Sequence, residues 1–468
     1  MSNRKIHNVI VLGAGLAGLA AGYKLSKAGL NTAIIERDLE VGGLAKTVSH
    51  NGFRFDLGGH RFSTDNKETE HFVLHEVLKD EALVVNRSSK ILLRGKYFDY
   101  PLQPLNAFFG LGLPTTSRII FDYVIEQLKR GLRDTQIISL EDWVVRQFGR
   151  TAFNIFFREY SEKVWGIDAS LVCGEWAAQR IQGLSLGTAI KAAFFKSGAA
   201  RFRTLASKFH YPPLGIGQIA EMLKREVEKS NHIATDTRIV RVNHSDRRIE
   251  SVTAQNGATT CEYTGNDFIS SIPLTTLVRL LHPKPPTDVL DAASRLRFRD
   301  LVIVTIMLDR ERVTDQTWIY IPEQKIPFGR LHEPTNWSRK MAPEGKTLLV
   351  MEHFCFRGDD TWSASDEALT RSTVTNLENL GFIKGHEVID SVVLRVPKAY
   401  PVFEVGYTQN HEKICDYLDG YRNLHYIGRG GSFKYYDTNH AMESGIAAAE
   451  EIIASVHITK SGMHHGFP

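Results

Sequence analysis

The sequence is poor in cysteine and has no long hydrophobic run, and each absence excludes a class of protein. Its 468 residues include only Cys173, Cys261, Cys355 and Cys415, and no two of them stand at a CxxC or zinc-binding spacing. We therefore expect free thiols in a reducing compartment, with neither a disulfide framework nor a metal site. No run of about 18 apolar residues occurs, so the sequence predicts no membrane-spanning helix.

The charge is also modest. A formal net charge of +4 and a pI near 8.7 are too weakly basic to indicate a nucleic-acid partner, whereas they suit a small anionic ligand. The opening letters MSNRK lead directly into an apolar segment, so we expect no signal peptide and predict a cytoplasmic protein. The length favours two or three domains.

The first forty residues have the pattern of a dinucleotide-binding βαβ unit. An apolar strand over residues 9–12 runs into GxGxxG, and Glu36 ends the next strand 23 residues after the first glycine. The first glycine permits a tight turn, the second lets the backbone approach a pyrophosphate, and the third lets the helix pack on the strand. The helix N-terminus favours the anion, and Glu36 is placed to bind a ribose hydroxyl. The three glycines are Gly13, Gly15 and Gly18.

Two further glycine pairs indicate FAD rather than NAD. Gly42 and Gly43 follow the acidic residue closely, as in flavoproteins that resemble the amine oxidases. Gly58 and Gly59 precede His60, and a Gly-Gly-His turn permits close passage beside an isoalloxazine ring. His60 is therefore a candidate flavin neighbour, although a hydrogen-bonded loop histidine would also fit.

A second glycine-rich turn lies near the end of the chain, in HYIGRGGSFKYYDTNHAMESGIAAAEEI. We expect a strand that ends at Gly428 and Arg429, followed by a helix that begins near Asn439 and continues through Ala441 and Met442. The N-terminus of that helix can face the flavin and stabilise negative charge in the reduced ring. The two ends of the chain would then share one FAD, unless this is an ordinary strand-turn-helix.

These patterns predict an α/β fold in which a Rossmann-type, GR2-like FAD-binding domain carries a helical insertion and an antiparallel β-sheet substrate domain. Ile239, on a strand near 238–242, is the expected backbone contact to adenine. The expected ranges are 1–100, 206–275 and 391–458 for the FAD-binding domain, 101–205 for the helical insertion, 276–390 for the substrate domain and 459–468 for a tail.

A basic segment over residues 191–209 leaves its role open. It carries small residues near its centre, and it would serve as a lid over a phosphorylated ligand, as a patch for peripheral membrane contact, or simply as a solvated helix face. A homodimer is also compatible with the sequence.

Longer motifs resemble a known family. The segments are GGHRFSTDN, FDYPLQPLNAFF, FREYSEKVWGIDASLVCGEWAAQRI, TWIYIPEQKIPFGR, AYPV and GRGGSFKYYDTN. Over nearly the whole chain they resemble the UDP-galactopyranose mutase family, within the amine oxidase and protoporphyrinogen oxidase superfamily. One departure is Asp437-Thr438-Asn439, where compact bacterial mutases have DMD. The motifs say least about the surface that would bind the nucleotide.

The resemblance implies a site for a nucleotide sugar. Two arginines would clamp the diphosphate, since guanidinium groups match phosphate oxygens. Tyrosine hydroxyls and an asparagine would complete that contact, and two aromatic residues would line the sugar pocket. The arginines are Arg180 and Arg330, which join His60 as catalytic candidates; the tyrosines are Tyr320, Tyr400 and Tyr435 beside Asn439; the sugar-lining residues are Tyr160 and Trp165.

The resemblance also implies a reaction. In the mutases, N5 of the reduced flavin attacks the anomeric carbon, displaces the nucleoside diphosphate and lets the sugar reclose through another hydroxyl. No net redox change occurs, NAD(P)H would serve only to prime the flavin, and the product would feed polysaccharide biosynthesis. The alternatives are an oxidase of the protoporphyrinogen or amine oxidase type, which takes hydride from its substrate, and a non-catalytic FAD-binding scaffold.

Overall fold

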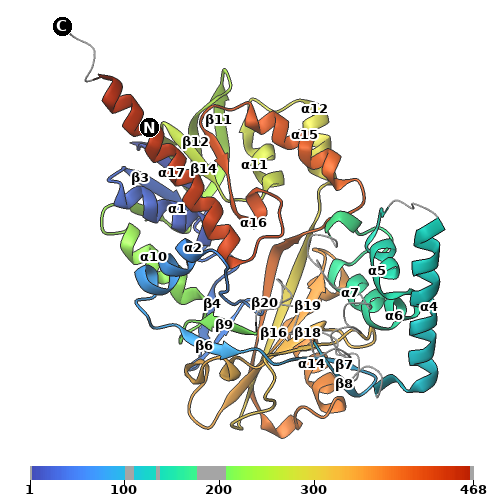
Figure 1. The fold of residues 1–468 in the computed structure, drawn as a ribbon. Coiled ribbons are helices and arrows are strands. Elements are labelled where there is room, and N and C mark those ends of the chain that lie inside the picture. Colours follow the sequence, from blue (N-terminus) through green and yellow to red (C-terminus); the bar gives the residue numbers. More distant parts are fainter. Residues whose placement is uncertain (1–2, 101–109, 133–136, 177–206, 464–468) are drawn as a thin grey trace.

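The computed structural model describes residues 3–100, 110–132, 137–176 and 207–463, and three regions meet in it (Figure 1). A parallel sheet with helices forms the first region, a larger and mostly antiparallel sheet forms the second, and a group of helices forms the third. This arrangement confirms the predicted α/β fold class. In the described ranges, no helix is both long and apolar enough to cross a membrane.

The parallel sheet has five strands in the order β10-β3-β2-β14-β21. Its central strand β2 and the neighbouring β3 are buried at every residue, as expected where helices cover both faces of a parallel sheet. The strands come from three separate stretches of the chain and pair in parallel throughout. They are β2 (Val9–Leu12), β3 (Thr32–Ile35), β10 (His232–Ala234), β14 (Asp267–Ser270) and β21 (Leu424–Tyr426).

Helices from the two ends of the chain pack directly on each other beside this sheet. α1 (Leu16–Lys27) lies against α17 (Thr438–Met463), and α10 (Gly217–Val227) also contacts α1. A Cβ atom at Gly445 would lie 2.1 Å from the carbonyl oxygen of Ala17, so only glycine allows this approach. The C-terminal helix is therefore fixed next to the first βαβ unit.

The larger sheet has seven strands in the order β20-β16-β19-β18-β17-β7-β8. Its neighbours pair antiparallel, except that β17 and β7 run parallel. β16 and β19 are buried along their whole length, which reflects their central place and apolar sequence. The strands are β7 (Ser89–Leu93), β8 (Lys96–Asp99), β16 (Phe298–Leu308), β17 (Trp318–Tyr320), β18 (Arg330–His332), β19 (Thr347–Cys355) and β20 (Val388–Pro401).

The last two strands at one side of this sheet come from the segment expected to belong wholly to the cofactor unit. β7 and β8 form a hairpin, and β7 pairs with β17 so that Ile91 lies opposite Tyr320. The expected boundary of the cofactor unit lies at residue 100, whereas the hairpin extends the sheet expected over 276–390. The reason is that β17 has an open edge, which a strand distant in sequence fills. β20 likewise continues past residue 390.

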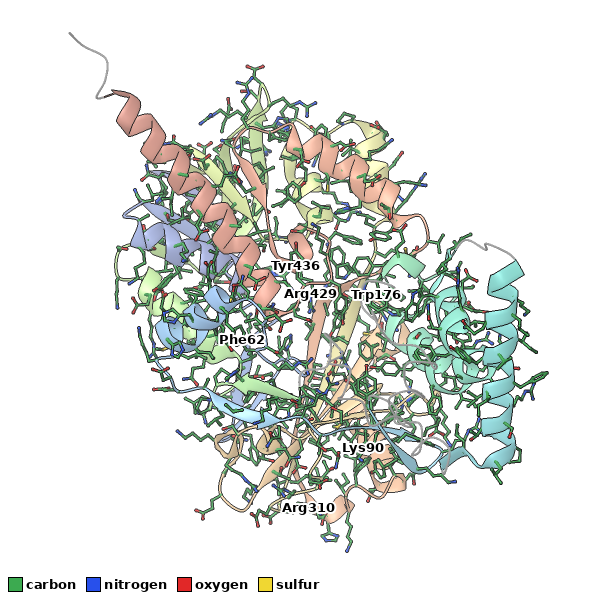
Figure 2. All side chains as sticks on the ribbon, in the orientation of Figure 1. Phe62, Lys90, Trp176, Arg310, Arg429 and Tyr436 are labelled. Atoms are coloured by element: carbon green, nitrogen blue, oxygen red, sulfur yellow. The ribbon has the colours of Figure 1, made fainter. Side chains whose placement is uncertain are left out.

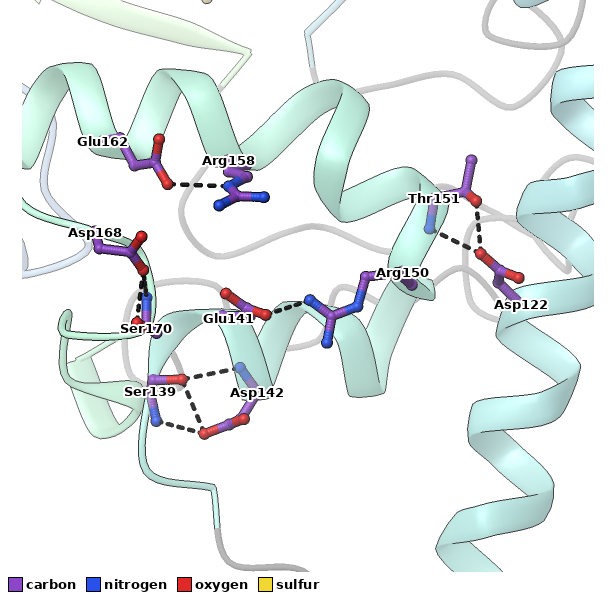
Figure 3. A network of polar contacts seen from close by, with 10 residues as sticks. All are labelled: Asp122, Ser139, Glu141, Asp142, Arg150, Thr151, Arg158, Glu162, Asp168 and Ser170. Carbon is purple, nitrogen blue, oxygen red and sulfur yellow. Dashed lines mark hydrogen bonds and ion pairs between the residues drawn. The ribbon is translucent and has the colours of Figure 1, made fainter.

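The helical region combines the long helix α4 with several short helices, and local polar contacts hold them together (Figure 3). Ser139 and Asp142 form a capping box at the start of α5. Asp122 on α4 accepts hydrogen bonds from the backbone nitrogen of Thr151 at 3.0 Å and from its hydroxyl at 2.6 Å, which ties α4 to α6. The elements are α4 (Leu113–Leu132), α5 (Leu140–Phe148), α6 (Arg150–Ala152), the π-helical η2 (Phe153–Phe157) and α7 (Arg158–Trp165).

The remaining elements frame these regions. A second five-stranded sheet, ordered β1-β13-β12-β11-β15, packs near the parallel sheet, and all four cysteines of the chain are free thiols. Its strands are β1 (Asn3–Ile6), β11 (Arg238–Ser245), β12 (Arg248–Asn256), β13 (Thr259–Thr264) and β15 (Leu281–His282). The others are β4 (Thr47–His50), β5 (Phe53–Asp56), α2 (Lys67–His71), η1 (Phe72–Val77), β6 (Leu83–Asn86), β9 (Lys208–Tyr211), α11 (Leu274–Leu280), α12 (Thr287–Arg295), η3 (Pro334–Asn336), η4 (Arg339–Met341), α13 (Asp360–Ser363), α14 (Asp366–Asn379), η5 (Gly385–Glu387), α15 (Tyr407–Asp419) and α16 (Gly428–Gly431).

Candidate active site

The glycines of the opening motif leave no room for side chains. A Cβ atom at Gly18 would lie 2.0 Å from the carbonyl oxygen of Gly13. Gly13 itself has φ +99°, and a Cβ there would lie 2.5 Å from Oγ of Ser271. The turn into α1 therefore requires glycine for both conformation and close packing.

The N-terminus of α1 is open to an anion. Gly15 is the N-cap, no side chain caps the helix, and its first turn holds no acidic residue. Gly42 donates its backbone nitrogen to the carbonyl oxygen of Ala14 at 2.8 Å, and a Cβ at Gly43 would lie 3.2 Å from Cα of Gly15. The two glycine segments thus face each other across a surface made of backbone alone. Unpaired amide groups at a helix N-terminus suit a pyrophosphate.

Glu36 is held at the end of β3, beside that turn. Its carboxylate accepts hydrogen bonds from the backbone nitrogens of Ala14 at 2.7 Å and Asp38 at 3.0 Å. Its own carbonyl oxygen accepts from the backbone nitrogen of Thr237 at 2.8 Å, which brings the start of β11, with Ile239, next to this end of the sheet. Each carboxylate oxygen keeps a lone pair for a ribose hydroxyl. The residues present therefore fit the adenosine diphosphate half of FAD.

The C-terminal turn reaches the same place. Gly428 has φ +73°, and a Cβ there would lie 3.0 Å from Cβ of Ala17 on α1. Its backbone nitrogen donates to Oγ of Ser444 at 2.9 Å. Asn439, which is 6% exposed in the first turn of α17, donates to Oγ1 of Thr64 at 3.4 Å, four residues beyond His60. The two ends of the chain and the Gly-Gly-His turn therefore border one site.

The first turn of α17 suits an electron-rich ring. It holds no acidic residue, so its positive dipole end is not neutralised by a carboxylate of its own first turn. Met442 is fully buried one turn into this helix, and Ala441 is partly buried beside it. Arg429, in α16, donates from Nε to the carbonyl oxygen of Tyr436 at 2.7 Å and from Nη1 to that of Ala399 at 3.3 Å. This arginine is fixed by the C-terminal turn itself.

The Gly-Gly-His turn is held by a hydrogen bond to the buried carboxylate of Glu352. The backbone nitrogen of Gly59 donates to Oε1 of Glu352 at 3.2 Å, and a Cβ at Gly59 would lie 2.2 Å from Nε1 of Trp318. Gly58 has φ +109° over the same carboxylate. Burial, together with the charges of Arg429 and Arg330, lowers the pKa of His60 to about 3, so its ring is neutral. Nδ1 of His60 is buried and has no hydrogen-bond partner among the described residues.

Arg330 lies across from Glu352 in neighbouring strands. Its Nη2 donates to Glu352, which is fully buried, and to the hydroxyl of Tyr400 at 2.9 Å. Its Nε is buried without a partner in the described part of the chain. Burial alone would lower the pKa of Arg330, but Glu352 and the nearby tyrosines raise it well above its ordinary value. The guanidinium group thus stays charged, and its Nε–H is not used by another group in the described part of the chain.

The predicted aromatic residues form two groups around Arg330. Tyr160 and Tyr320 meet edge to face with ring centroids 5.7 Å apart, while Tyr400 and Tyr435 are stacked at 5.9 Å. Trp165 lies 6.2 Å from Tyr435. Burial raises the pKa of Tyr160 well above its ordinary value, so its hydroxyl remains a hydrogen-bond donor. The aromatic candidates for substrate contacts therefore lie close to one another and to Arg330.

Several residues in this place were not predicted from the sequence. Trp176 lies 5.7 Å from Tyr435 and 4.7 Å from Trp165, and its Nε1 is buried with no partner in the described ranges. Figure 2 shows Trp176 and Arg429 between the lower end of α17 and the helical region. Glu352 and Tyr100, whose ring lies 4.7 Å from that of Tyr320, were also missed. Trp176 falls inside the motif that the sequence analysis quoted, whereas Glu352 carries no local signal.

Two expectations lie outside the described residues. Arg180 belongs to 177–206, and so does most of the basic segment 191–209. Among the described residues, no group of three or more histidine, cysteine, aspartate or glutamate side chains is arranged to hold a metal ion.

Comparisons with known proteins agree with this architecture. The family model described as flavin containing amine oxidoreductase matches residues 16–453. Protoporphyrinogen oxidase 2 of Arabidopsis thaliana is 21% identical over 95% of this chain and 94% of its own. The Klebsiella pneumoniae protein named "Probable UDP-galactopyranose mutase" is 26% identical over 35% of this chain and 42% of its own.

A solved structure of reduced UDP-galactopyranose mutase is similar in fold. It superposes with a TM-score of 0.83 at 21% identity, covering 96% of both chains. At this identity the likeness concerns the fold, so the residues of the site have to carry any argument about the substrate.

Proposed function

The chain belongs to the flavin containing amine oxidoreductase family, and from this premise we propose that it is an FAD-dependent isomerase of a nucleotide sugar. The reduced FAD, when bound, would supply through N5 the nucleophile that displaces the nucleoside diphosphate from the anomeric carbon. The protein's own part is to hold the diphosphate, orient the sugar and keep water away from the reacting carbon.

The observation that carries this proposal is the environment of Arg330. The guanidinium group of Arg330 is charged, and its Nε–H has no partner among the described residues. It lies beside Tyr400 and close enough to His60 to lower the pKa of that ring. A leaving diphosphate needs such donors, because negative charge develops on its bridging oxygen as the glycosidic bond breaks. The hydroxyls of Tyr400 and Tyr435 and the amide of Asn439 would donate further hydrogen bonds, and Arg180 would be the second arginine.

The sign of the charge argues against a cationic amine as the substrate. The positive charges of Arg330 and Arg429 both lower the pKa of His60. Cζ of Arg429 also lies 4.9 Å from the ring centroid of Tyr400 and 5.4 Å from that of Tyr435. An ammonium substrate would meet two positive charges there, with the Glu352 carboxylate already engaged by Arg330 and Gly59. A diphosphate would be attracted instead. Trp165 and Tyr160 would offer flat apolar surfaces to the sugar ring.

His60 would act as a neutral group. With a pKa lowered to about 3, it carries no charge at neutral pH and can donate or accept a hydrogen bond according to its tautomer. Its backbone lies in the glycine turn that the cofactor ring would border, so it is placed to orient that ring or a sugar hydroxyl.

The second candidate is an oxidoreductase that takes hydride from its substrate. The relative that supports it is protoporphyrinogen oxidase 2, which aligns with 95% of this chain. In that reaction each turnover would leave the flavin reduced, and an external oxidant would be consumed.

One experiment separates the two candidates. The purified yellow protein is reduced once under anaerobic conditions, with dithionite or NAD(P)H, and incubated with UDP-galactopyranose. The proposal predicts a second UDP-hexose by chromatography, many turnovers per flavin and no further loss of reductant. A parallel sample keeps the flavin oxidised and receives UDP-galactose or a porphyrinogen. An oxidised product formed there in step with flavin reduction, with no second UDP-hexose in the reduced sample, would reject the proposal in favour of the oxidoreductase.

A further inference from the structure

A buried lysine outside the proposed ligand contacts lies in a ring of backbone carbonyl oxygens. Nζ of Lys163 donates to the carbonyl oxygens of Ile321 at 2.9 Å, Glu323 at 2.5 Å, Ile326 at 2.9 Å and Phe328 at 3.3 Å. Lys163 is 8% exposed and forms no salt bridge within the described part of the chain. Its charge is therefore stabilised by peptide dipoles rather than by a carboxylate within bonding distance.

All four oxygens belong to the loop that joins β17 to β18. The ends of this loop are site residues: Tyr320 immediately precedes it and Arg330 follows it. Gln324 in this loop makes two more hydrogen bonds to the same helix. It donates from Nε2 to the carbonyl oxygen of Glu159 at 2.9 Å and from its backbone nitrogen to the carboxylate of Glu159 at 3.3 Å. Lys163 thus connects α7, which carries Tyr160 and Trp165, to the loop between Tyr320 and Arg330.

A second buried cation, Arg299, binds the backbone carbonyl groups at the end of α7. Arg299 on β16 is 6% exposed and donates from Nη2 to the carbonyl oxygen of Lys163 and from Nε to that of Val164, both at 3.1 Å. These are terminal carbonyl groups of α7, where a positive charge is favoured by the helix dipole. Gly166 ends the helix with φ +69°, and a Cβ there would lie 2.4 Å from Nη1 of Arg299. The end of α7 is therefore fixed to the large sheet from both sides.

We propose that Lys163 is a positioning residue, whose ammonium group fastens the 321–328 loop to α7 and so holds Tyr320 and Arg330 in place relative to Tyr160 and Trp165. Arg299 fixes the helix, and Lys163 fixes the loop to the helix. The consequence for the substrate rests on the proposed function, whereas the fastening of the loop does not.

The ring of oxygens supplies a specific test. Lys163→Ala removes three methylene groups and the ammonium group, so propylammonium has the size and charge to restore both. Lys163→Met keeps most of the apolar stem but no donor, and it leaves no space for the added amine. The control is Lys325→Ala, because Lys325 lies in the same loop with a side chain 78% exposed and paired with Glu323 at the surface.

The first readout is limited trypsin digestion of the FAD-bound protein, with cleavage after Lys325 identified by mass spectrometry. We expect Lys163→Ala and Lys163→Met to be cut after Lys325 on the order of tenfold faster than wild type, because the loop opens more often without its cation. Propylammonium should restore resistance to Lys163→Ala and leave Lys163→Met unchanged. Lys325→Ala removes the cleavage site, so it should lose this fragment and keep the thermal stability of wild type.

The second readout is kcat/KM for UDP-galactopyranose with the reduced enzyme, which we expect to fall on the order of 100-fold in Lys163→Ala and to recover with propylammonium. Equal cleavage rates for wild type and both variants would overturn the proposal, and so would rescue of Lys163→Met. If Lys163→Ala does not yield yellow protein, Lys163→Met alone decides by its cleavage rate. If the digestion behaves as expected but wild type does not turn over UDP-galactopyranose, the fastening role stands and the proposed substrate is wrong.

Discussion

The cofactor cradle and the substrate wall are built in different ways. The cradle around Gly13, Gly43 and Gly428 presents backbone, and its contacts depend on the absence of side chains. The wall around Arg330 presents charged and aromatic side chains that strands and helices distant in sequence bring together. A backbone surface binds any dinucleotide of the right shape, whereas the wall decides which substrate can react. Substitutions should therefore separate binding of FAD from choice of substrate.

The largest effect is expected in the cradle, from Gly18→Ala. The new Cβ would lie 2.0 Å from the carbonyl oxygen of Gly13, and backbone must shift to accommodate it. We expect protein without bound FAD and without activity, measured as the ratio of absorbance at 450 nm to that at 280 nm, about zero for a colourless protein. The control is Gly29→Ala, where φ is +74° but no atom lies within 4 Å of the new Cβ. It should cost about 1 kcal/mol and keep the yellow colour. A yellow Gly18→Ala protein would contradict the account.

The next effect is expected in the wall, from Arg330→Met. The substitution removes the diphosphate donor and leaves the fully buried Glu352 without its cation. We expect kcat/KM to fall about 1000-fold and the free energy of unfolding to fall by about 3 kcal/mol, while the protein stays yellow. Arg330→Met combined with Glu352→Gln should recover most of the stability and none of the activity. Arg180→Ala should likewise lose activity and keep FAD. Near-normal rates in either arginine variant would reject the diphosphate contact.

Two buried titratable groups, Asp56 on β5 and His60 in the Gly-Gly-His turn, should give opposite dependences of stability on pH. Burial raises the pKa of Asp56 to about 7, against hydrogen bonds from Thr47, Tyr211 and the backbone of Ile216 that favour the carboxylate. Its stabilising contribution is complete below about pH 4 and is lost as the pH rises through 7. His60, with its pKa lowered to about 3, has the opposite sign, since the unfolded chain binds more protons between about pH 3 and 6.5.

Single variants should reveal these opposed slopes. The difference in melting temperature between Asp56→Asn and wild type should rise steadily from pH 4 to about 7. The difference between His60→Gln and wild type should instead fall as the pH rises from 4 to about 6.5. The measurement is thermal unfolding of the FAD-bound protein across this range. Parallel curves for wild type and Asp56→Asn would show that the carboxyl group is not buried as described.

The smallest effect is expected from Trp176→Phe. The phenyl ring can keep the stacking on Phe403, where the two ring centroids lie 6.1 Å apart at 11°, but it removes the Nε1 donor that lacks a partner among the described residues. We expect an unchanged or slightly higher melting temperature and a rise in KM of about fivefold, because the lost donor serves a ligand rather than the fold. Unchanged kinetics would remove Trp176 from the wall.

The cradle could be predicted from the sequence because its signals are local. GxGxxG, the acidic residue at the end of β3 and the strand-turn-helix at residue 428 each occupy a few consecutive positions. Their meeting at one site followed from the length of FAD, and the structure brings them together through the packing of α1 on α17. Backbone geometry of this kind leaves a direct trace in glycine spacing.

The wall was predicted only where a family resemblance named its residues. The pairing of Arg330 with Glu352 depends on the register between β18 and β19, which no local pattern sets. The same holds for Lys163, whose four acceptors are carbonyl groups of a loop more than 150 residues away. Strand β7 pairs with β17 across a still longer separation in the sequence. Long-range pairing of polar groups has no periodicity in the sequence and needs the fold.

The central claim is that Arg330 holds a diphosphate beside the flavin. The most direct measurement is a crystal structure of the reduced, FAD-bound protein with UDP. The account predicts a phosphate oxygen within about 3 Å of Nε of Arg330, on the same side as the flavin ring and His60. A pyrophosphate bound elsewhere, with Arg330 contacting only Glu352 and Tyr400, would contradict it.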